Sequence, residues 1–228
     1  FSTSQLVASL KDTNGWIRDR AQQILIHNKD EEALPKLKNI LGKNDSPLSQ
    51  IHALYVLEGL DALDFDLLGN MVKNGRPNVA SHALVLMEGF TSAQNVSKAE
   101  QVFKAAMDRN EPMLDLYLSS TLGVWAQYDQ GLFFPVIYEL SQKYSDKKIY
   151  QEAIVSGAQK VMPSLQAGMD KLANLQDSDL DDLLAETMSR QENDKPNYIY
   201  STRIARADSR TDGAVLFRQI CASCHSSS

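Results

Sequence analysis

Short polar breaks, each followed by a proline, recur at a nearly constant interval in this 228-residue chain. Pro47, Pro77 and Pro112 each come after such a break. Proline suits the first turn of a helix, because its ring fixes φ near the helical value and the N–H that it lacks has no partner there. With Gly15 and Lys147 at the equivalent places, the successive spacings are 32, 30, 35 and 35 residues. We therefore expect a helix to begin at each of these five positions.

Apolar residues between the breaks recur at i, i+3, i+4 and i+7, which is the pattern of amphipathic helices. No alternation of apolar and polar residues is long enough to indicate a strand. A repeat of 30–35 residues that holds two helices is typical of an α-solenoid. The sequence therefore predicts an all-α fold, an α–α superhelix of about six helix pairs, as a repeat domain over residues 1–193. The expected pairs are 3–11 with 15–28, 31–41 with 47–60, 64–73 with 77–90, 96–109 with 112–128, 132–144 with 147–160, and 165–175 with 178–192.

Small and aromatic residues recur at fixed places within this pattern. Six positions after each expected start lie Ala21, Ala53, Ala83, Leu118 and Ala153, and we expect the alanines to let neighbouring helices approach closely. We expect Trp16, Trp125 and the pair Phe133–Phe134 to pack between helices.

Two histidines match in position between successive repeats. His52 and His82 each directly precede one of the alanines. A shared metal site is conceivable, but two ligands without a third favour a structural role. The first 210 residues contain no Ser/His/Asp or Cys/His arrangement and no glycine-rich phosphate loop, so we expect no catalytic residue in them.

The pattern lapses after residue 193. Residues 194–210 are polar and contain Pro196, which predicts a linker or arm. Arg203, Arg206 and Arg210 form a small basic patch there, either solvated or a docking strip for an acidic surface. A helical pattern resumes at Thr211, and residues 211–228 are expected to begin a further domain.

The only two cysteines of the chain lie in the pentapeptide Cys221-Ala222-Ser223-Cys224-His225. In a C-x-x-C-H motif the two thiols form thioethers with haem and the histidine ligates the iron. Zinc would need about four ligands, and no second pair exists. A redox dithiol belongs at a helix N-terminus, whereas this motif ends a helical stretch. The motif therefore predicts a haem c site with Cys221, Cys224 and His225 as its residues, with zinc, dithiol chemistry or chance as alternatives.

Charge and composition exclude several classes of protein. The net charge of −6 argues against a nucleic-acid binder, which needs clustered Lys and Arg. No stretch approaches the roughly 18–20 apolar residues that a membrane span requires. The chain opens Phe-Ser-Thr-Ser without Met or a signal region, so we expect it to be part of a longer protein.

Two parts of the sequence resemble known families. The segments that resemble HEAT-like or armadillo-like repeats are Asn14-Gly15-Trp16-Ile17-Arg18-Asp19, with Ala21, Gln22 and Leu25 after it, and His52-Ala53-Leu54 followed by Leu57-Glu58-Gly59-Leu60. Gly213, Leu216, Phe217, Cys221, Cys224 and His225 are spaced as in the opening helix of a class I c-type cytochrome. Together these features resemble a bacterial family of membrane-bound dehydrogenases, in which a quinoprotein-like β-propeller precedes a HEAT-repeat region and a cytochrome c domain.

This resemblance implies a periplasmic or cell-envelope redox protein whose haem accepts electrons from a dehydrogenase domain. Cys221 and Cys224 would hold haem c, and His225 would be the proximal iron ligand. The implied partners are other domains of the same polypeptide or a redox partner protein, and this region itself is expected to be non-catalytic. In that family a glycine follows the histidine and a distal methionine lies downstream. Here Ser226 follows His225 and all seven methionines lie upstream, so we expect only the start of a cytochrome domain, with incomplete haem binding.

Three functions follow as hypotheses. The first is a helical-repeat scaffold region of a multidomain, haem-containing electron-transfer protein. The second is a protein–protein interaction solenoid without a redox role. The third, a HEAT-type enzyme that binds damaged DNA, needs a basic groove and is opposed by the acidic balance of the chain.

Overall fold

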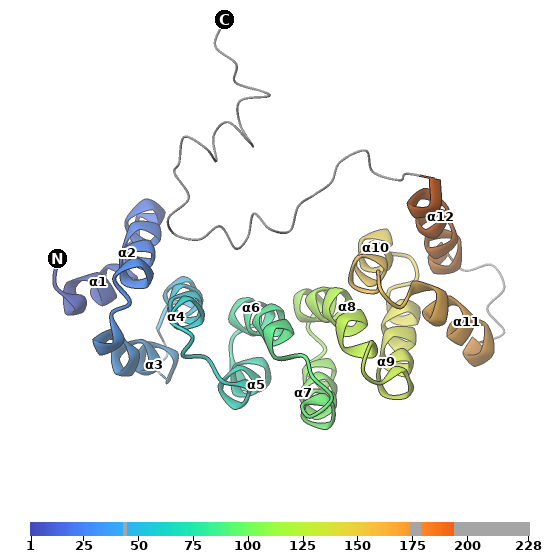
Figure 1. Ribbon diagram of the computed structural model, residues 1–228, viewed down its shortest axis with the longest axis horizontal. Helices are drawn as coiled ribbons and strands as arrows, with labels where there is room; N and C mark the ends of the chain where they lie inside the picture. Colours follow the sequence, from blue (N-terminus) through green and yellow to red (C-terminus); the bar gives the residue numbers. More distant parts are fainter. Residues whose placement is uncertain (43–44, 174–178, 194–228) are drawn as a thin grey trace, which may run out of the picture. The chain divides into compact units, whose positions relative to one another are not determined.

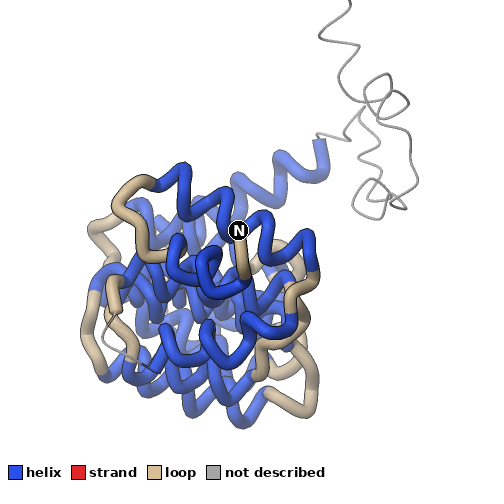
Figure 2. The backbone as a smooth tube through the Cα atoms, turned by 90° about the vertical axis from the view of Figure 1, so that its left-hand side faces the viewer, coloured by secondary structure: helices blue, strands red, loops and turns tan. Residues whose placement is uncertain are grey.

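The structure, a computed structural model, describes residues 1–42, 45–173 and 179–193. These residues form α-helices and two short 3-10 helices and contain no strand (Figures 1 and 2), so the all-α prediction is confirmed. The helices are α1 (Thr3–Ser9), α2 (Gly15–Asn28), α3 (Leu34–Gly42), α4 (Pro47–Gly59), α5 (Phe65–Asn74), α6 (Pro77–Met87), α7 (Val96–Asp108), α8 (Pro112–Ala126), α9 (Gln130–Lys143), α10 (Lys148–Gly157), α11 (Met162–Ala173) and α12 (Asp179–Asn193), with η1 (Glu31–Ala33) and η2 (Glu88–Phe90).

Two compact units divide the chain at Ser189, and the fold below is that of residues 1–189. Each predicted helix is present in this unit or at its end, with bounds within three residues of expectation, although the stretch expected to begin at residue 31 starts as 3-10 helix. None of the helices in the described ranges is long and apolar enough to cross a membrane. The predicted linker 194–210 and the predicted cytochrome start 211–228 lie outside the described residues.

The helices of this unit pack as two rows (Figure 1). Helices α1, α3, α5, α7 and α9 form an odd row, and each packs on the next helix in the chain. Helices α2, α4, α6, α8 and α10 form an even row, in which each helix also packs on the following even helix. The contacts thus establish a stack of helix pairs, while the superhelical geometry stays a prediction.

Prolines start the helices where the sequence places them. Pro47, Pro77 and Pro112 stand in the first turn of α4, α6 and α8, as predicted. Side chains cap other starts, since Asn14 accepts from the N–H of Trp16 and Asp129 accepts from that of Leu132. These caps satisfy backbone donors that would otherwise lack a partner.

Long polar side chains cap the C-terminal ends of odd-row helices. The Gln50 amide of α4 donates to the carbonyls of Ile40 and Leu41 in α3. The Gln151 amide of α10 likewise donates to the carbonyls of Ser141 and Tyr144, at 3.1 and 3.0 Å. These bonds satisfy terminal carbonyls while they tie each odd helix to its even partner.

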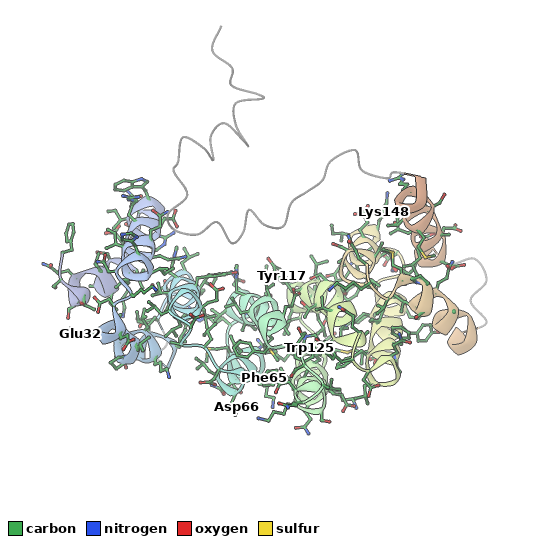
Figure 3. The ribbon with its side chains drawn as sticks, in the orientation of Figure 1. Glu32, Phe65, Asp66, Tyr117, Trp125 and Lys148 are labelled. Atoms are coloured by element: carbon green, nitrogen blue, oxygen red, sulfur yellow. The ribbon has the colours of Figure 1, made fainter. Side chains whose placement is uncertain are left out.

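An aromatic cluster fills the space between the rows at the middle of the stack. Trp125 of α8 contacts Phe65 of α5, Phe103 of α7 and Phe133 of α9, with ring centroids 5.6–6.4 Å apart. Figure 3 shows Phe65 and Trp125 pointing into this interior. The prediction of interhelical packing is confirmed for Trp125 and Phe133. It is wrong for Trp16, which stands in the first turn of α2 and is 69% exposed.

The backbones of α8 and α10 meet at glycines, which the repeat pattern did not single out. A Cβ atom on Gly123 of α8 would lie 2.5 Å from Cα of Ala158, and one on Gly157 of α10 would collide with the carbonyl oxygen of Ser120. Ala153 is only half-buried, although Ala21, Ala53 and Ala83 are buried as expected. The backbones of α8 and α10 therefore lie in contact at these two glycines.

Candidate interaction face

The residues of the predicted haem site lie outside the described part of the chain. Cys221, Cys224 and His225 are among residues 194–228, as are Arg203, Arg206 and Arg210 of the basic patch. The roles of Cys221, Cys224 and His225 therefore stay predictions based on the motif. The described helices offer a different kind of site, on the surface of the even row.

Polar and aromatic side chains form a continuous line across four even-row helices. We call Gln22, His52, Tyr55, His82 and Tyr117 the strip. His52, His82 and Tyr117 each stand five positions after the proline that starts its helix, so the repeat itself aligns them. Figure 3 shows Tyr117 on the side of α8 away from the odd row. Five side chains from α2, α4, α6 and α8 thus share one surface.

Each histidine of the strip is bonded to the preceding even helix. His52 Nδ1 lies 2.7 Å from Oε1 of Gln22, and its Nε2 lies 3.9 Å from the exposed carboxylate of Asp19. His82 Nδ1 lies 3.0 Å from the hydroxyl of Tyr55, and the two rings meet edge to face at 5.6 Å. The His82 ring also contacts that of Tyr117, 6.3 Å away. The histidines therefore join neighbouring repeats.

Burial keeps these groups uncharged near neutral pH. It lowers the pKa of His82 below 6.5, and it does the same for His52, where Arg18 adds to the effect and Asp19 opposes it. Burial also raises the pKa of Tyr55, with smaller contributions from Tyr117 and Glu58. The strip thus presents neutral rings and hydroxyls, which suit hydrogen bonding and aromatic packing against a partner.

The structure does not gather metal ligands around these histidines. Within residues 1–42, 45–173 and 179–193, no three His, Cys, Asp or Glu side chains converge to hold a metal ion. Both imidazoles instead bond to Gln22 and Tyr55, groups that sequence spacing did not single out. The repeat spacing could have identified these partners, because Gln22 and Tyr55 each lie on an even-row helix one repeat before the histidine that they contact.

Two grooves open beside the strip. One lies between α4 and α6 and has a volume of about 430 Å³; its lining is Glu58, Asp61, Leu63, Val85, Leu86, Gly89 and Phe90. The other lies between α8 and α10, with a volume of about 380 Å³ and a lining of Leu116, Tyr117, Ser120, Ile149, Glu152, Ala153 and Ser156. Both are lined largely by apolar side chains with carboxylates at the rim.

Large apolar side chains stand in the first turns of four even-row helices, α2, α4, α8 and α10. Trp16, Leu48 and Met113 each occupy the second residue of α2, α4 or α8 and are 69%, 51% and 48% exposed. Ile149 has the same place in α10 and is 56% exposed. Exposed apolar groups that recur at one register of a row are typical of an interaction surface.

A buried polar network anchors α8, α9 and α10 behind this surface. Asp115 of α8 is fully buried and accepts hydrogen bonds from Lys143 Nζ and the Tyr144 hydroxyl, both at 2.7 Å. Tyr144 stacks on Tyr150, whose hydroxyl donates to the carbonyl of Pro112. Burial, together with Asp115, raises the pKa of Tyr144. These hydrogen bonds and the ring stack tie α8 to α9 and α10, which gives the network a structural role.

Sequence and structure comparisons give no relative for this chain: no protein-family model, no curated protein and no solved structure matches it.

Proposed function

We propose that this chain is a helical-repeat scaffold of a haem-containing electron-transfer protein, which presents the even row to a protein partner and carries a haem c attachment motif at residues 221–225. The observation that carries the proposal is the Cys221-x-x-Cys224-His225 motif in a chain whose described helices form a stacked array. The helix stack carries the scaffold part of the proposal and the motif carries the redox part, and each part has its own test.

The redox part of the proposal rests on the donor chemistry of the motif. Two thiols spaced by two residues suit the thioether bonds of haem c, and the adjacent imidazole suits its iron. When bound, haem c supplies one-electron transfer. Cys221 and Cys224 would attach it, and His225 would ligate the iron. The resemblance to the dehydrogenase family makes a periplasmic or cell-envelope location part of the same proposal.

The scaffold part rests on how the described side chains are used. Apolar and aromatic residues fill the space between the rows, and the strip and grooves face outward on the even row. Repeat arrays bind partners along such extended surfaces. The partner in this proposal is another domain of the same polypeptide or a separate redox protein.

Covalent haem attachment tests the redox part. The gene product that contains this chain is expressed in a bacterial periplasm with the cytochrome c maturation system. After denaturation and acid–acetone extraction, retained haem and a c-type pyridine haemochrome spectrum are expected. Cys221→Ala with Cys224→Ala should abolish retained haem, whereas Ser226→Ala, a matched change beside the motif, should leave it.

A second function is favoured by the strip itself, which is independent of the motif. If the gene product never acquires covalent haem, the redox part is wrong. A protein–protein interaction scaffold without a redox role then remains, supported by the strip and the two grooves of the even row.

A further inference from the structure

We infer that the groove between α4 and α6 binds a cationic amphipathic segment of a protein partner, in which an apolar side chain enters the groove and flanking Lys or Arg residues pair with Glu58 and Asp61. The inference develops the scaffold part of the proposed function and does not depend on the haem motif. It follows from the shape, the charge and the surroundings of this groove.

The floor of the groove is apolar and unobstructed. Leu63, Leu86 and Phe90 line it and are only partly buried, so they keep apolar surface in contact with solvent. Gly89 has no atom of another residue within 4 Å of the position of a Cβ, which leaves the space above it open. Covering this surface with an aliphatic or aromatic side chain gains about 25 cal/mol per Å² of apolar area removed from water.

The rim of the groove is acidic. Glu58 and Asp61 are exposed, and neither carboxylate forms an ion pair within the part of the chain that the structure describes. Among the described residues, no Lys or Arg lines the groove. The turn after α4 holds the two acids on the same rim, since the N–H of Asp61 donates to the carbonyl of Glu58 at 2.9 Å. A positively charged partner therefore complements this groove.

The nearby carboxylate of Glu88 does not belong to this rim. Its Oε1 accepts a hydrogen bond from Thr121 of α8 at 3.0 Å, and burial raises the pKa of this carboxyl group. Glu88 is thus directed toward α8 and away from the groove. The unpaired negative charge at the groove comes from Glu58 and Asp61.

The strip extends the same surface in the direction of α8. Tyr55 precedes Glu58 by one turn of α4, and His82 precedes Val85 by one turn of α6. The faces of Tyr55 and Tyr117 offer cation–π contacts to a further Lys or Arg of the segment. A groove with a rim of carboxylates and a border of aromatic rings suits a segment with alternating apolar and cationic residues.

The groove between α8 and α10 does not share this charge. Its carboxylate, Glu152, lies 3.5 Å from the Nζ of Lys148, so part of its charge is offset within the chain. A nucleic-acid phosphate is repelled by Glu58 and Asp61. The charge of the α4–α6 groove therefore selects a cationic peptide.

Fluorescence anisotropy with a synthetic peptide tests the inference. The probe is a fluorescein-labelled hexapeptide Lys-Arg-Leu-Phe-Arg-Lys, titrated with the purified full chain in about 50 mM NaCl, where Debye screening is weak. Binding is expected, with loss of affinity as NaCl is raised. The double variant Glu58→Gln with Asp61→Asn should weaken binding about tenfold, in line with two exposed ion pairs in a partly desolvated site. Gly89→Leu, which fills the groove without a charge change, should weaken it as well.

Matched controls separate this site from general charge attraction. Glu31→Gln with Glu32→Gln removes the same charge from η1, where Figure 3 places Glu32 beside the odd row, and should leave the affinity unchanged. A peptide with Ser in place of Leu and Phe should bind more weakly than the probe. Far-ultraviolet circular dichroism of each variant confirms that its helices are intact.

Four outcomes would overturn the inference: no binding of the probe, equal binding by the Glu58/Asp61 variant, equal loss in the Glu31/Glu32 variant, or equal binding of the serine peptide. Displacement of the probe by CaCl₂ beyond that caused by NaCl of equal ionic strength would also overturn it, in favour of an ion site. None of these outcomes bears on haem attachment, and loss of haem attachment does not bear on them.

Discussion

Asp115 is the residue of the described helices whose charge is most removed from water. Its carboxylate is 0% exposed and depends on Lys143 and Tyr144 for partners, while its Oδ1 atom has none. A buried charge that loses its counter-ion keeps its desolvation cost without compensation. Stability at this corner of the fold therefore depends on a few polar contacts.

Replacement of Lys143 by Met should lower the free energy of unfolding by about 3 kcal/mol, because it leaves the Asp115 carboxylate buried without its cation. Urea denaturation followed by circular dichroism measures this change. Lys38→Met, on the exposed surface of α3, is the control and should shift stability by less than about 0.5 kcal/mol. Equal effects of the two substitutions would show that the Lys143–Asp115 pair is not the cause.

Acidification should weaken the fold through His52 and His82. Both have a pKa below 6.5 in the folded chain, so the unfolded chain takes up protons first as the pH falls. Their contribution is complete above about pH 6.5 and is lost as the pH falls from there through the lowered pKa values.

Urea denaturation at a series of pH values between 5 and 7.5 checks this expectation. The double variant His52→Gln with His82→Gln should show a smaller decline in unfolding free energy across this range than the unmodified chain. Parallel curves for the two proteins would mean that other groups titrate there.

Single residues also mark the limits of sequence reasoning. Pro47, Pro77 and Pro112 identify helix starts correctly, because the effect of proline on a first turn is local. The burial of Asp115 and the exposure of Trp16 were not foreseeable in this way. Each depends on which other helix covers the residue, and that is a tertiary property.

The crossing of α8 and α10 shows the same limit at the level of helices. The sequence pointed to alanines as small residues at helix contacts and did not single out Gly123 and Gly157, where the backbones of α8 and α10 meet. The face of a helix on which a residue lies can be predicted from the apolar periodicity, because that pattern depends on neighbouring residues in the sequence. The point at which two helices touch depends on the angle and offset between them, which the spacing of the helix starts does not specify.

Alanine at Gly157 should destabilise the fold by about 2 kcal/mol, although alanine favours helices by about 1 kcal/mol over glycine. The reason is that the added methyl group collides with the Ser120 carbonyl oxygen, which belongs to backbone and cannot rotate away. The control is Gly42→Ala at the end of α3, where no atom lies within 4 Å of the new methyl group. Chemical denaturation should show a loss for Gly157→Ala and no loss for Gly42→Ala; a gain for both would place α8 and α10 farther apart.

At the scale of the whole unit, contacts between neighbouring helix pairs predict how substitutions combine. Leu37 in α3 and Phe103 in α7 belong to different pairs, whereas Phe103 and Trp125 are in ring contact. The changes in unfolding free energy caused by Leu37→Ala and by Phe103→Leu should therefore add within about 0.5 kcal/mol in the double variant. Phe103→Leu with Trp125→Phe should depart from additivity by more than that. Denaturation of the single and double variants measures both, and equal coupling in the two cycles would contradict a stack of local contacts.

The candidate site could be predicted only in part. The matching positions of His52 and His82 in their repeats favoured a structural role, and in the structure each bonds to a side chain of the preceding even helix. Their partners Gln22 and Tyr55, and the grooves beside them, depend on the packing of one repeat on the next. For Cys221, Cys224 and His225 the opposite holds. The sequence motif specifies their chemistry, but these residues lie outside the part of the chain that the structure describes.

The serial packing of the even row has a mechanical consequence. A load applied along such a row passes through each helix–helix junction in turn, so the extensions of the junctions add, as they do for springs in series. The junction of α8 with α10, where backbones touch at Gly123 and Gly157, has little room to deform. Extension of the row is then set by its other junctions, among them the one between α4 and α6, where the groove offers room for a ligand. A ligand that contacts both helices there would stiffen that junction of the row.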